Sequence, residues 1–345
     1  MIAGLILIFL LVLVLPFFVK GVEHQLEAFL LAMGLLAAAL SGVLDGRLAA
    51  EAVVDPLRIT LAVFAFGLLF RAFRRRIRHA LYGLALKLNL FLFIFVVTVA
   101  IGFLSSVITA IIAALVLVEV VDAFDLDRRT ELAMVISGCY AIGLGAVLTP
   151  VGEPLSTILV AKLRGGPIHA TFLFPLQTFG WLIAPGVFAC GLAPLLLAVR
   201  EPQGGASLGE DYAETLGTIL ARAVRVYVFV MALTLLGAGF KPLIDRYFAQ
   251  VSGLALYWLN SVSAILDNAT LTAAEIGPAL SPGQVRDAVL GLLIAGGMLI
   301  PGNIPNIICA RKLRIRPKEW AAIGVPFGLT LMALYFLVLW LLPRG

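Results

Sequence analysis

An aspartate and an asparagine stand side by side within one of the most apolar stretches of this chain. Asp267 and Asn268 end the segment SVSAILDN, which lies between the runs LALYWL and ATLTAA. Ser263 and Thr270 place hydroxyl groups on the same short stretch. Carboxylate, carboxamide and hydroxyl oxygens are the hard ligands that small hard cations prefer. The segment therefore predicts a cation-binding site.

Two segments rich in proline and glycine supply a second set of polar side chains. They are TPVGEP, at 149–154, and PGNIPN, at 301–306. Prolines remove backbone donors and free carbonyl groups, so a helix that contains two of them breaks. We expect the side chains at these breaks to line the same site, with Glu153 as its second carboxylate. The polar residues concerned are Thr149, Glu153, Ser156 and Thr157 at the first break and Asn303 and Asn306 at the second.

The elements that carry these residues are expected to be transmembrane helices. Of the 345 residues, 62% are hydrophobic and only 13% are charged. Apolar stretches of about 18 residues or more recur, which predicts an all-α polytopic membrane protein embedded in a lipid bilayer. The net charge of +5 does not indicate a nucleic-acid partner, because basic residues in membrane proteins mainly report orientation. The three cysteines show no metal-ligand or disulfide spacing, and no cofactor is expected.

Asp267 lies where a carboxylate is costly. An acid at the bilayer centre costs about 2.5–3.5 kcal/mol on insertion scales, so such residues are rare and normally functional. If the acid holds either a proton or a metal cation, the two compete, and alternating access then gives cation/proton exchange. Glu119 and Glu275, in the second arms of the two hairpins, either line the site or mark the interfacial ends of the hairpins.

The apolar stretches divide the chain into four parts. We expect N-terminal transmembrane helices at 1–50, a first repeat at 51–199, a cytoplasmic linker at 200–221 and a second repeat at 222–345. Each repeat is predicted to contain a re-entrant hairpin, with tips near GFLSS (102–106) and SVSAILDN, followed by a broken helix. Whether 81–103 is a full span or part of the first hairpin stays open. Full spans are expected near 2–19, 26–44 and 56–73, within 168–199, and near 222–243 and 321–342.

Two sequence matches indicate that the repeats are copies. Leu104-Ser-Ser-Val107 matches Leu259-Asn-Ser-Val262, an offset of 259 − 104 = 155. Pro150 and Pro154 match Pro301 and Pro305 at an offset of 151, and both segments then reach Lys-Leu-Arg. On this alignment Glu153 corresponds to Ile304 and Asp267 to Ile112, so each copy gives one acid to a shared site.

The orientation follows from the number of crossings and from the basic residues. A unit that crosses three times gives a second copy of opposite orientation, the inverted-repeat arrangement of secondary transporters. Placing both termini outside puts most Lys and Arg residues on the cytoplasmic side of a plasma or inner membrane, as the positive-inside rule requires. The segments RRRIRH, Arg128-Arg129 and RKLRIRPK are then cytoplasmic.

At these motifs the chain resembles the ion transporter superfamily, and within it the NhaD-type sodium/proton antiporters and a related family of small cation transporters. The resemblance implies inverted repeats with re-entrant hairpins, Na⁺ and protons as the exchanged ions, and a homodimer. The break carries Glu rather than the Asp of that pattern, and the first hairpin tip has only Ser105, Ser106 and Thr109. The matching residues are Ser263, Asp267 and Asn268 in one half and Pro150, Gly152, Glu153 and Thr157 in the other.

Other functions compete with cation/proton exchange. A sodium-coupled symporter of a dicarboxylate or similar oxyanion, as elsewhere in the same superfamily, is the first alternative, although a fixed carboxylate repels an anion. An intramembrane enzyme is not expected, because the sequence has no His-Glu-x-x-His, Gly-x-Gly-Asp or Gly-x-Ser-x-Gly motif. A channel needs a continuous selectivity pore, whereas paired helix breaks indicate alternating access.

Overall fold

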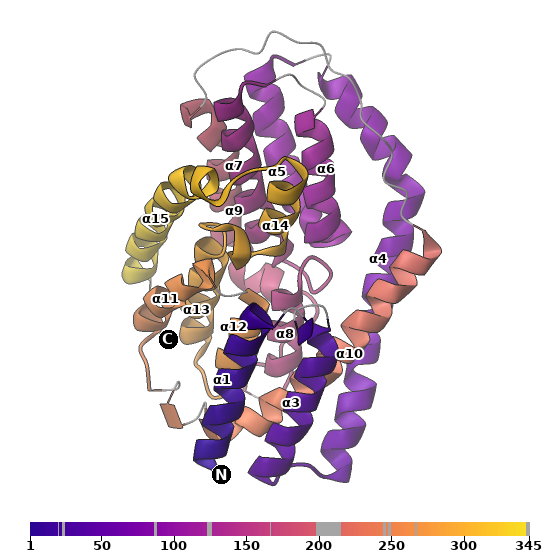
Figure 1. Ribbon diagram of the computed structural model, residues 1–345, viewed down its shortest axis with the longest axis vertical. Coiled ribbons are helices and arrows are strands. Elements are labelled where there is room, and N and C mark those ends of the chain that lie inside the picture. The colour runs from indigo at the N-terminus through magenta and orange to yellow at the C-terminus, as the bar shows by residue number, and fades with distance from the viewer. Residues whose placement is uncertain are drawn as a thin grey trace.

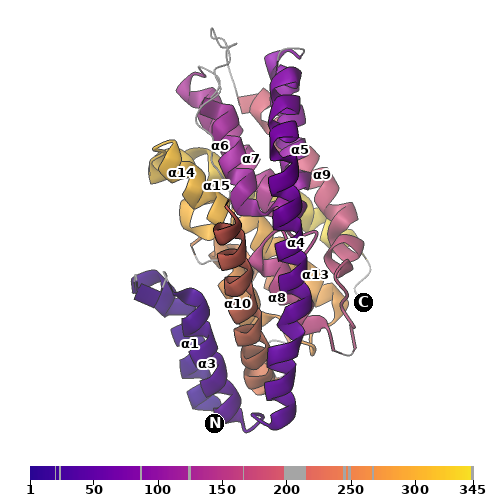
Figure 2. The ribbon, with the colours of Figure 1, turned by 90° about the vertical axis from the view of Figure 1, so that its right-hand side faces the viewer.

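The computed structural model describes most of the chain, and its regular elements are helices (Figures 1 and 2). No strand occurs among the described residues, which confirms the predicted all-α class for that part of the chain. The described ranges are 1–19, 21–22, 25–85, 88–122, 126–165, 167–197, 215–243, 246–247, 250–265 and 268–342.

Four helices form a layer on one side of the molecule, here termed the outer layer. Small residues allow close packing within it: a Cβ atom at Gly34 would lie 2.8 Å from the Ala232 carbonyl oxygen, and one at Gly239 would lie 2.6 Å from the Ala37 carbonyl carbon. The layer contacts the rest of the protein partly through Ile158. Its helices are α1 (Ile2–Phe18), α3 (Leu26–Ser41), α4 (Gly46–Ala85) and α10 (Leu216–Leu243).

The first half of the remaining helices is built around one helix that breaks. Helices α5, α6 and α7 lie together in the upper part of Figure 1, and α8 continues downward beyond the break. Asp127 caps α7 by accepting hydrogen bonds from the Arg129 and Thr130 backbone amides. The helices are α5 (Leu90–Ile108), α6 (Ala110–Asp122), α7 (Arg128–Ala146), α8 (Pro154–Leu163) and α9 (Phe174–Leu197).

The second half repeats this order of elements. Helices α11, α12 and α13 lie together in the lower part of Figure 1, and α14 lies in the upper part beside α6. Ser281 caps α13 through a capping box with Gln284. The elements are α11 (Gly253–Leu259), η2 (Asn260–Ala264), α12 (Asn268–Glu275), α13 (Pro282–Ala295), η3 (Ile300–Gly302), α14 (Ile304–Lys312) and α15 (Pro317–Leu341).

Membrane character is evident in helix length and composition. Four helical segments in the described part of the chain are long and apolar enough to cross a bilayer. They are Phe91–Ile108, Phe174–Leu195, Leu216–Leu243 and Pro317–Leu341.

Several predicted boundaries fall elsewhere in the structure. The basic segment 71–79 lies inside α4, and the boundary between residues 50 and 51 falls within the same helix. Residues 200–214 of the predicted linker lie outside the described ranges, and α10 begins within that linker at Leu216. The apolar stretch predicted to start at 81 is divided, because 81–85 end α4 and α5 begins at Leu90.

Candidate functional site

The first helix break occupies 147–153 and is closed by its own side chains. The Gly152 amide donates to the Thr149 carbonyl oxygen at 3.1 Å. Ser156 Oγ donates to the same carbonyl oxygen at 2.6 Å, and Thr157 Oγ1 donates to the Pro150 carbonyl oxygen at 2.7 Å. Glu153 is the N-cap of α8, with φ −152° and 5% of its surface exposed. Of the four predicted polar residues, Thr149 and Glu153 lie in the break and Ser156 and Thr157 in the first turn of α8, and the hydroxyl groups of Thr149, Ser156 and Thr157 bind its backbone.

The second break, at 296–303, uses a carboxamide for the same purpose. The Gly302 amide donates to the Leu299 carbonyl oxygen at 3.3 Å. Asn306 Nδ2 donates at 2.9 Å to both the Leu299 and Gly296 carbonyl oxygens. Asn303 is the N-cap of α14, also with φ −152°, and its Oδ1 accepts the Ile304 amide at 2.8 Å. Asn303 and Asn306 are both buried.

The two breaks make equivalent contacts, and equivalent residues are 150 positions apart in the chain. In each, a side chain three residues beyond the N-cap donates to a carbonyl oxygen seven residues earlier, from Ser156 to Thr149 and from Asn306 to Leu299. The offset is 306 − 156 = 150, one less than the prolines predict, because Pro154 opens α8 whereas Pro305 is the second residue of α14. The expectation that Glu153 corresponds to Ile304 is therefore wrong, and its structural counterpart is Asn303.

The first hairpin turns against the first break. The chain reverses between α5 and α6 at Thr109, which has φ 74°, a strained conformation for a β-branched residue. The next amide, of Ala110, donates to the Gly152 carbonyl oxygen at 2.8 Å. Thr149 Oγ1 donates to the Ser106 carbonyl oxygen. Strained residues cluster at functional sites, so the contact between tip and break is a candidate functional element.

The second hairpin approaches the second break in the same way. Ser263 Oγ contacts Asn268 Oδ1 and the Leu292 carbonyl oxygen, the latter at 3.1 Å. A Cβ atom at Gly296 would lie 2.5 Å from the Asn268 carboxamide. A Cβ atom at Gly302 would lie 2.6 Å from the Ser263 carbonyl oxygen. Gly302 leaves room for the hairpin backbone, and Gly296 leaves room for the Asn268 side chain.

A serine occupies corresponding places in the two hairpins. Ser105 Oγ donates to the Ile142 carbonyl oxygen at 3.1 Å, as Ser263 Oγ does to that of Leu292. Since Ile142 and Leu292 are 150 residues apart, Ser105 corresponds to Ser263. The predicted alignment at offset 155 paired Ser105 with Asn260. The hydrogen bonds pair Ser105 with Ser263 instead, three residues further along the chain.

Asn303 brings the two halves together. A Cβ atom at Gly143, in α7, would lie 2.8 Å from Asn303 Nδ2, so the side chain of the second break contacts the helix that leads to the first. Gly297, in the second break, likewise leaves no room for a side chain beside the Tyr140 ring of α7. The second break thus packs against the helix that leads to the first break, and the buried region that they share with the neighbouring hairpin residues is here termed the centre.

Several buried polar atoms at this centre have no hydrogen-bond partner among the described residues. They include Asn306 Oδ1 and Asn268 Nδ2. A buried polar atom without a partner is costly, so such atoms indicate a missing ligand or water. No group of three His, Cys, Asp or Glu side chains gathers in the described part of the chain. The available oxygens are those of carbonyl, hydroxyl and carboxamide groups, together with the Glu153 carboxylate.

Two predicted ligands cannot be placed. Asp267, the predicted carboxylate ligand of the second hairpin, lies outside the described residues. Thr270 lies on α12, but its side chain is outside the description. The structure brings together Ser263 and Asn268 at one tip, and Thr149, Ser156, Thr157, Asn303 and Asn306 with Glu153 at the breaks.

Sequence reasoning missed one charged pair. Lys162, in α8, is 7% exposed, and its Nζ donates to the carbonyl oxygens of Ala273 and Ile276. It also interacts electrostatically with Glu275, which is 9% exposed. Glu275 is thus buried within the protein at the end of α12, and its position relative to the membrane interface stays a prediction. The signal was present, because Lys162 is an ionisable residue in an otherwise apolar helix.

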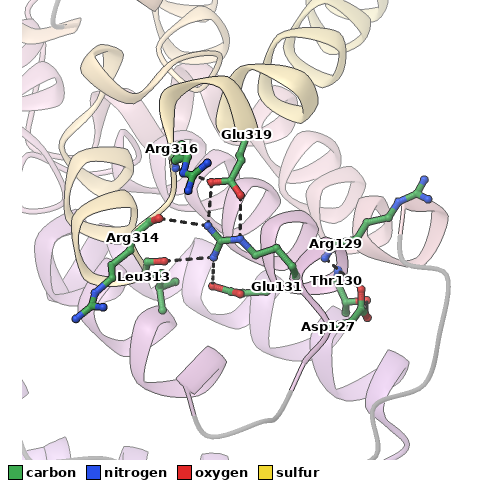
Figure 3. A network of polar contacts seen from close by, with 9 residues as sticks. Asp127, Arg129, Thr130, Glu131, Leu313, Arg314, Arg316 and Glu319 are labelled. Carbon is green, nitrogen blue, oxygen red and sulfur yellow. Dashed lines mark hydrogen bonds and ion pairs between the residues drawn. The ribbon is translucent and has the colours of Figure 1, made fainter.

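A polar network joins the start of α7 to the segment before α15, at the end of the molecule away from Lys162 and Glu275 (Figure 3). The Arg128 guanidinium binds both carboxylate oxygens of Glu319, at 3.2 and 3.0 Å, and Glu131 at 2.9 Å. It also donates to the carbonyl oxygens of Leu313 and Arg314, each at 3.3 Å. Two of the predicted cytoplasmic segments, at 128–129 and 311–318, therefore lie at the same end of the protein.

Comparison with known families gives one finding. A family model described as "Protein of unknown function (DUF1646)" matches residues 2–342. None of the curated proteins compared with the sequence matches it.

Proposed function

Because the chain belongs to the DUF1646 family along almost its whole length, we propose one activity for the matched region as a unit. It is a secondary active transporter that exchanges a small cation, Na⁺ in the first instance, for protons by alternating access. The observation that carries this proposal is the pair of helix breaks with matching hydrogen bonds at offset 150, each packed against a hairpin tip. Paired breaks at corresponding positions are the best pointer to a transport site.

The proposal includes an inverted repeat. The α5–α6 hairpin lies in the upper part of the molecule and the α11–η2–α12 hairpin in the lower part (Figure 1). Each short helix beyond a break contacts the returning arm of the other hairpin: α14 contacts α6, and α8 contacts α12. Both hairpins are then re-entrant from opposite faces of the membrane. Backbone that leaves the helical conformation at membrane depth is tolerated where protein or a water-filled cavity covers it.

The cation site is assigned to the centre where the breaks and tips meet. Asn306 Oδ1 is a buried acceptor without a hydrogen-bond partner among the described residues, and the carbonyl oxygens freed by the prolines are further hard ligands. Glu153 supplies a carboxylate at the N-terminus of α8. Asp267 and Asn268 supply the second acid and a carboxamide from the hairpin. The cation and the proton then compete for one set of oxygens.

The membrane and its sides are part of the proposal. The end that carries the Arg128 network is assigned to the cytoplasm, because positive residues favour that side. The N-terminus lies at the other end of the molecule in Figure 1 and is assigned to the outside, as is the C-terminus. The protein then resides in a plasma or inner membrane, and a homodimer is its proposed assembly.

Ion exchange in proteoliposomes tests the function. A pH gradient is imposed and followed with a pH-sensitive dye while Na⁺, Li⁺, K⁺ and Ca²⁺ are added in turn. Wild-type protein is expected to collapse the gradient in a cation-dependent manner, and Asp267→Asn is expected to abolish that response. Asp122→Asn, an exposed acid at the far end of α6, is the matched control and should respond as wild type does. Persisting pH-dependent cation flux in Asp267→Asn would refute the role of Asp267.

One observation favours a second candidate, a sodium-coupled anion symporter. Asn268 Nδ2 is a buried donor without a partner among the described residues, and it lies at the N-terminus of α12, where the helix dipole favours an anion. The test is sodium-driven uptake of a labelled dicarboxylate. Uptake in the absence of any cation-driven proton movement would select this candidate.

A further inference from the structure

The charged pair of Lys162 and Glu275 lies away from the centre just described. Lys162 stands in the last turn of α8, and Glu275 is the last residue of α12. Both side chains are more than nine-tenths buried. Ionisable residues inside a membrane protein are expensive and mark ion or proton pathways by default. We therefore consider whether this pair takes part in ion or proton movement.

The lysine side chain is oriented by three contacts. Its aliphatic stem packs on α10, where a Cβ atom at Gly237 would lie 3.4 Å from Lys162 Cε. Its Nζ donates to the carbonyl oxygens of Ala273 and Ile276, the latter at 3.0 Å. These carbonyl groups belong to the C-terminal end of α12, which carries the negative end of the helix dipole. The lysine thus joins α8 to the returning arm of the second hairpin.

Glu275 completes the pair but is only partly satisfied. It interacts with Lys162, and the Asn260 side chain lies beside it. Its Oε2 has no hydrogen-bond partner among the described residues. A buried carboxylate oxygen left open in this way can accept a proton without breaking an existing hydrogen bond.

A cavity links Lys162 to the surface of the protein, and its lining includes Ile276, the neighbour of Glu275 in the chain, but not Glu275 itself. It has a volume of about 460 Å³, lies between the outer layer and α8, and is large enough for several water molecules. Lys162 and Ile276 line it, so it reaches the carbonyl group that the lysine binds. The other charged residues that line it are Glu51 from α4, Lys241 from α10 and Arg164 beyond α8.

We propose that Glu275, paired with Lys162, binds the exchanged proton and takes it from water in this cavity. The inference rests on the proposed exchange and deepens it by separating the two ions: the cation is held at the breaks and tips, and the proton at Glu275. Protonation converts the carboxylate to a neutral acid, and Lys162 keeps its two carbonyl contacts. Release of the proton to the cavity restores the charged pair. Since α12 begins at Asn268, the proton site and the cation site share one short helix.

The counterpart at the other end provides the control. Lys312 stands in the last turn of α14 and interacts with Asp122, the last residue of α6, but both side chains are exposed. Asp122→Asn and Lys312→Gln therefore remove the same charges from the corresponding place without a buried pair.

Two measurements on the full-length protein test the inference. The first is the infrared difference spectrum between acidic and alkaline detergent solution, which shows the C=O band of a carboxyl group that gains a proton. This band is expected to be lost in Glu275→Gln and kept in Asp122→Asn. The second is Na⁺-driven proton movement in proteoliposomes as a function of pH. Glu275→Gln, which is isosteric, is expected to lose this movement while Na⁺ binding, followed by calorimetry, persists.

The two measurements test the proton site and the proposed exchange separately. A band unchanged in Glu275→Gln, or a pH profile like that of wild type, overturns the proton site. Wild-type protein that moves no protons with any cation overturns the proposed function, while the infrared band still decides whether Glu275 titrates. If Glu275→Gln does not fold, Lys162→Gln replaces it. The pH midpoint of the band is then expected to shift, whereas Lys312→Gln leaves it in place.

Discussion

The two ends of this protein carry the same pair of charges in opposite surroundings. At one end Lys162 and Glu275 are buried where α8 meets α12. At the other end Lys312 and Asp122 occupy the corresponding places on α14 and α6 and are exposed. A lysine at the end of a short helix beside an acid at the end of a hairpin arm is thus a repeated feature, and only one copy is enclosed.

The outer layer accounts for the difference. Helix α10 covers Lys162 through Gly237, and α4 forms the far wall of the adjoining cavity through Leu48 and Glu51. Ala269 and Ala273 of α12 pack in one apolar cluster with α1, α3 and α10. Local sequence therefore sets the charges, whereas the packing of a separate layer decides which pair is removed from water. A buried pair is sensitive to loss of either partner, and an exposed one is not.

The largest expected effect is the loss of one buried partner. Lys162→Met leaves Glu275 without its counter-charge and should destabilise the protein by about 3–5 kcal/mol. Lys312→Met should change stability by less than about 1 kcal/mol. Chemical denaturation in detergent measures both. The double variant Lys162→Met with Glu275→Gln should recover part of the loss. Equal effects of the two lysine substitutions would show that the pairs are not distinguished by burial.

A smaller effect is expected at the two breaks, which share one hydrogen-bond pattern. Gly152→Ala places a Cβ atom 2.0 Å from the Ala146 carbonyl oxygen, and Gly302→Ala places one 2.6 Å from that of Gly296. Each should cost about 1–3 kcal/mol, with Gly152→Ala the larger. Thermal unfolding is the measurement. Gly46→Ala, with open space around it, is the control and should fall within about 0.5 kcal/mol of wild type.

Arg128 connects α7 to the start of α15 at the exposed end of the protein, as Lys162 connects α8 to α12 at the buried one. Arg128→Lys loses the paired contacts with both oxygens of Glu319, because an ammonium group cannot form that fork. The expected cost is about 1 kcal/mol, and it should shrink as salt is added, since the network is partly exposed. Unfolding at low and high ionic strength checks this. The cost of Lys162→Met should not depend on salt, and a salt effect of equal size at both ends would contradict the comparison.

The smallest expected effect is acid weakening of one helix cap. Thr130 donates to the Asp127 carboxylate and lowers its pKa, as do the Thr130 and Arg129 amides. A lowered pKa stabilises the folded state at pH values above the ordinary value of about 3.9, and this contribution is lost as the pH falls through the lower folded value. The cap of α7 should then weaken by about 0.5 kcal/mol, whereas Ser281, which caps α13, does not titrate.

Hydrogen exchange at the two helix starts measures this difference. Protection of the Arg129 and Thr130 amides should fall on acidification, while that of the Gln284 amide stays constant relative to neighbouring amides. Asp127→Asn, which keeps an acceptor but cannot titrate, should remove the pH dependence. A parallel loss at both caps would instead indicate general unfolding in acid.

The sequence by itself determined the class of this protein and the place of its breaks. Apolar runs dictate helices, and two prolines within a few residues dictate a break, because neither depends on distant contacts. The polar residues at those breaks, from Thr149 to Thr157 and at Asn303 and Asn306, lie where the pattern predicts. These features are local, so they can be read without tertiary structure.

The tertiary structure decided which residues of the two halves correspond and which charges are buried. The matching prolines predict that corresponding residues of the two halves are 151 positions apart. The hydrogen bonds at the breaks depend on where α8 and α14 begin, not on where the prolines lie. They give a separation of 150 residues, so Glu153 corresponds to Asn303. The sequence alignment pairs Glu275 with Glu119, whereas in the structure Glu275 and Asp122 are the acids that end α12 and α6. Only the packing of α10 and α4 beside α8 separates them, because burial depends on residues far away in the chain.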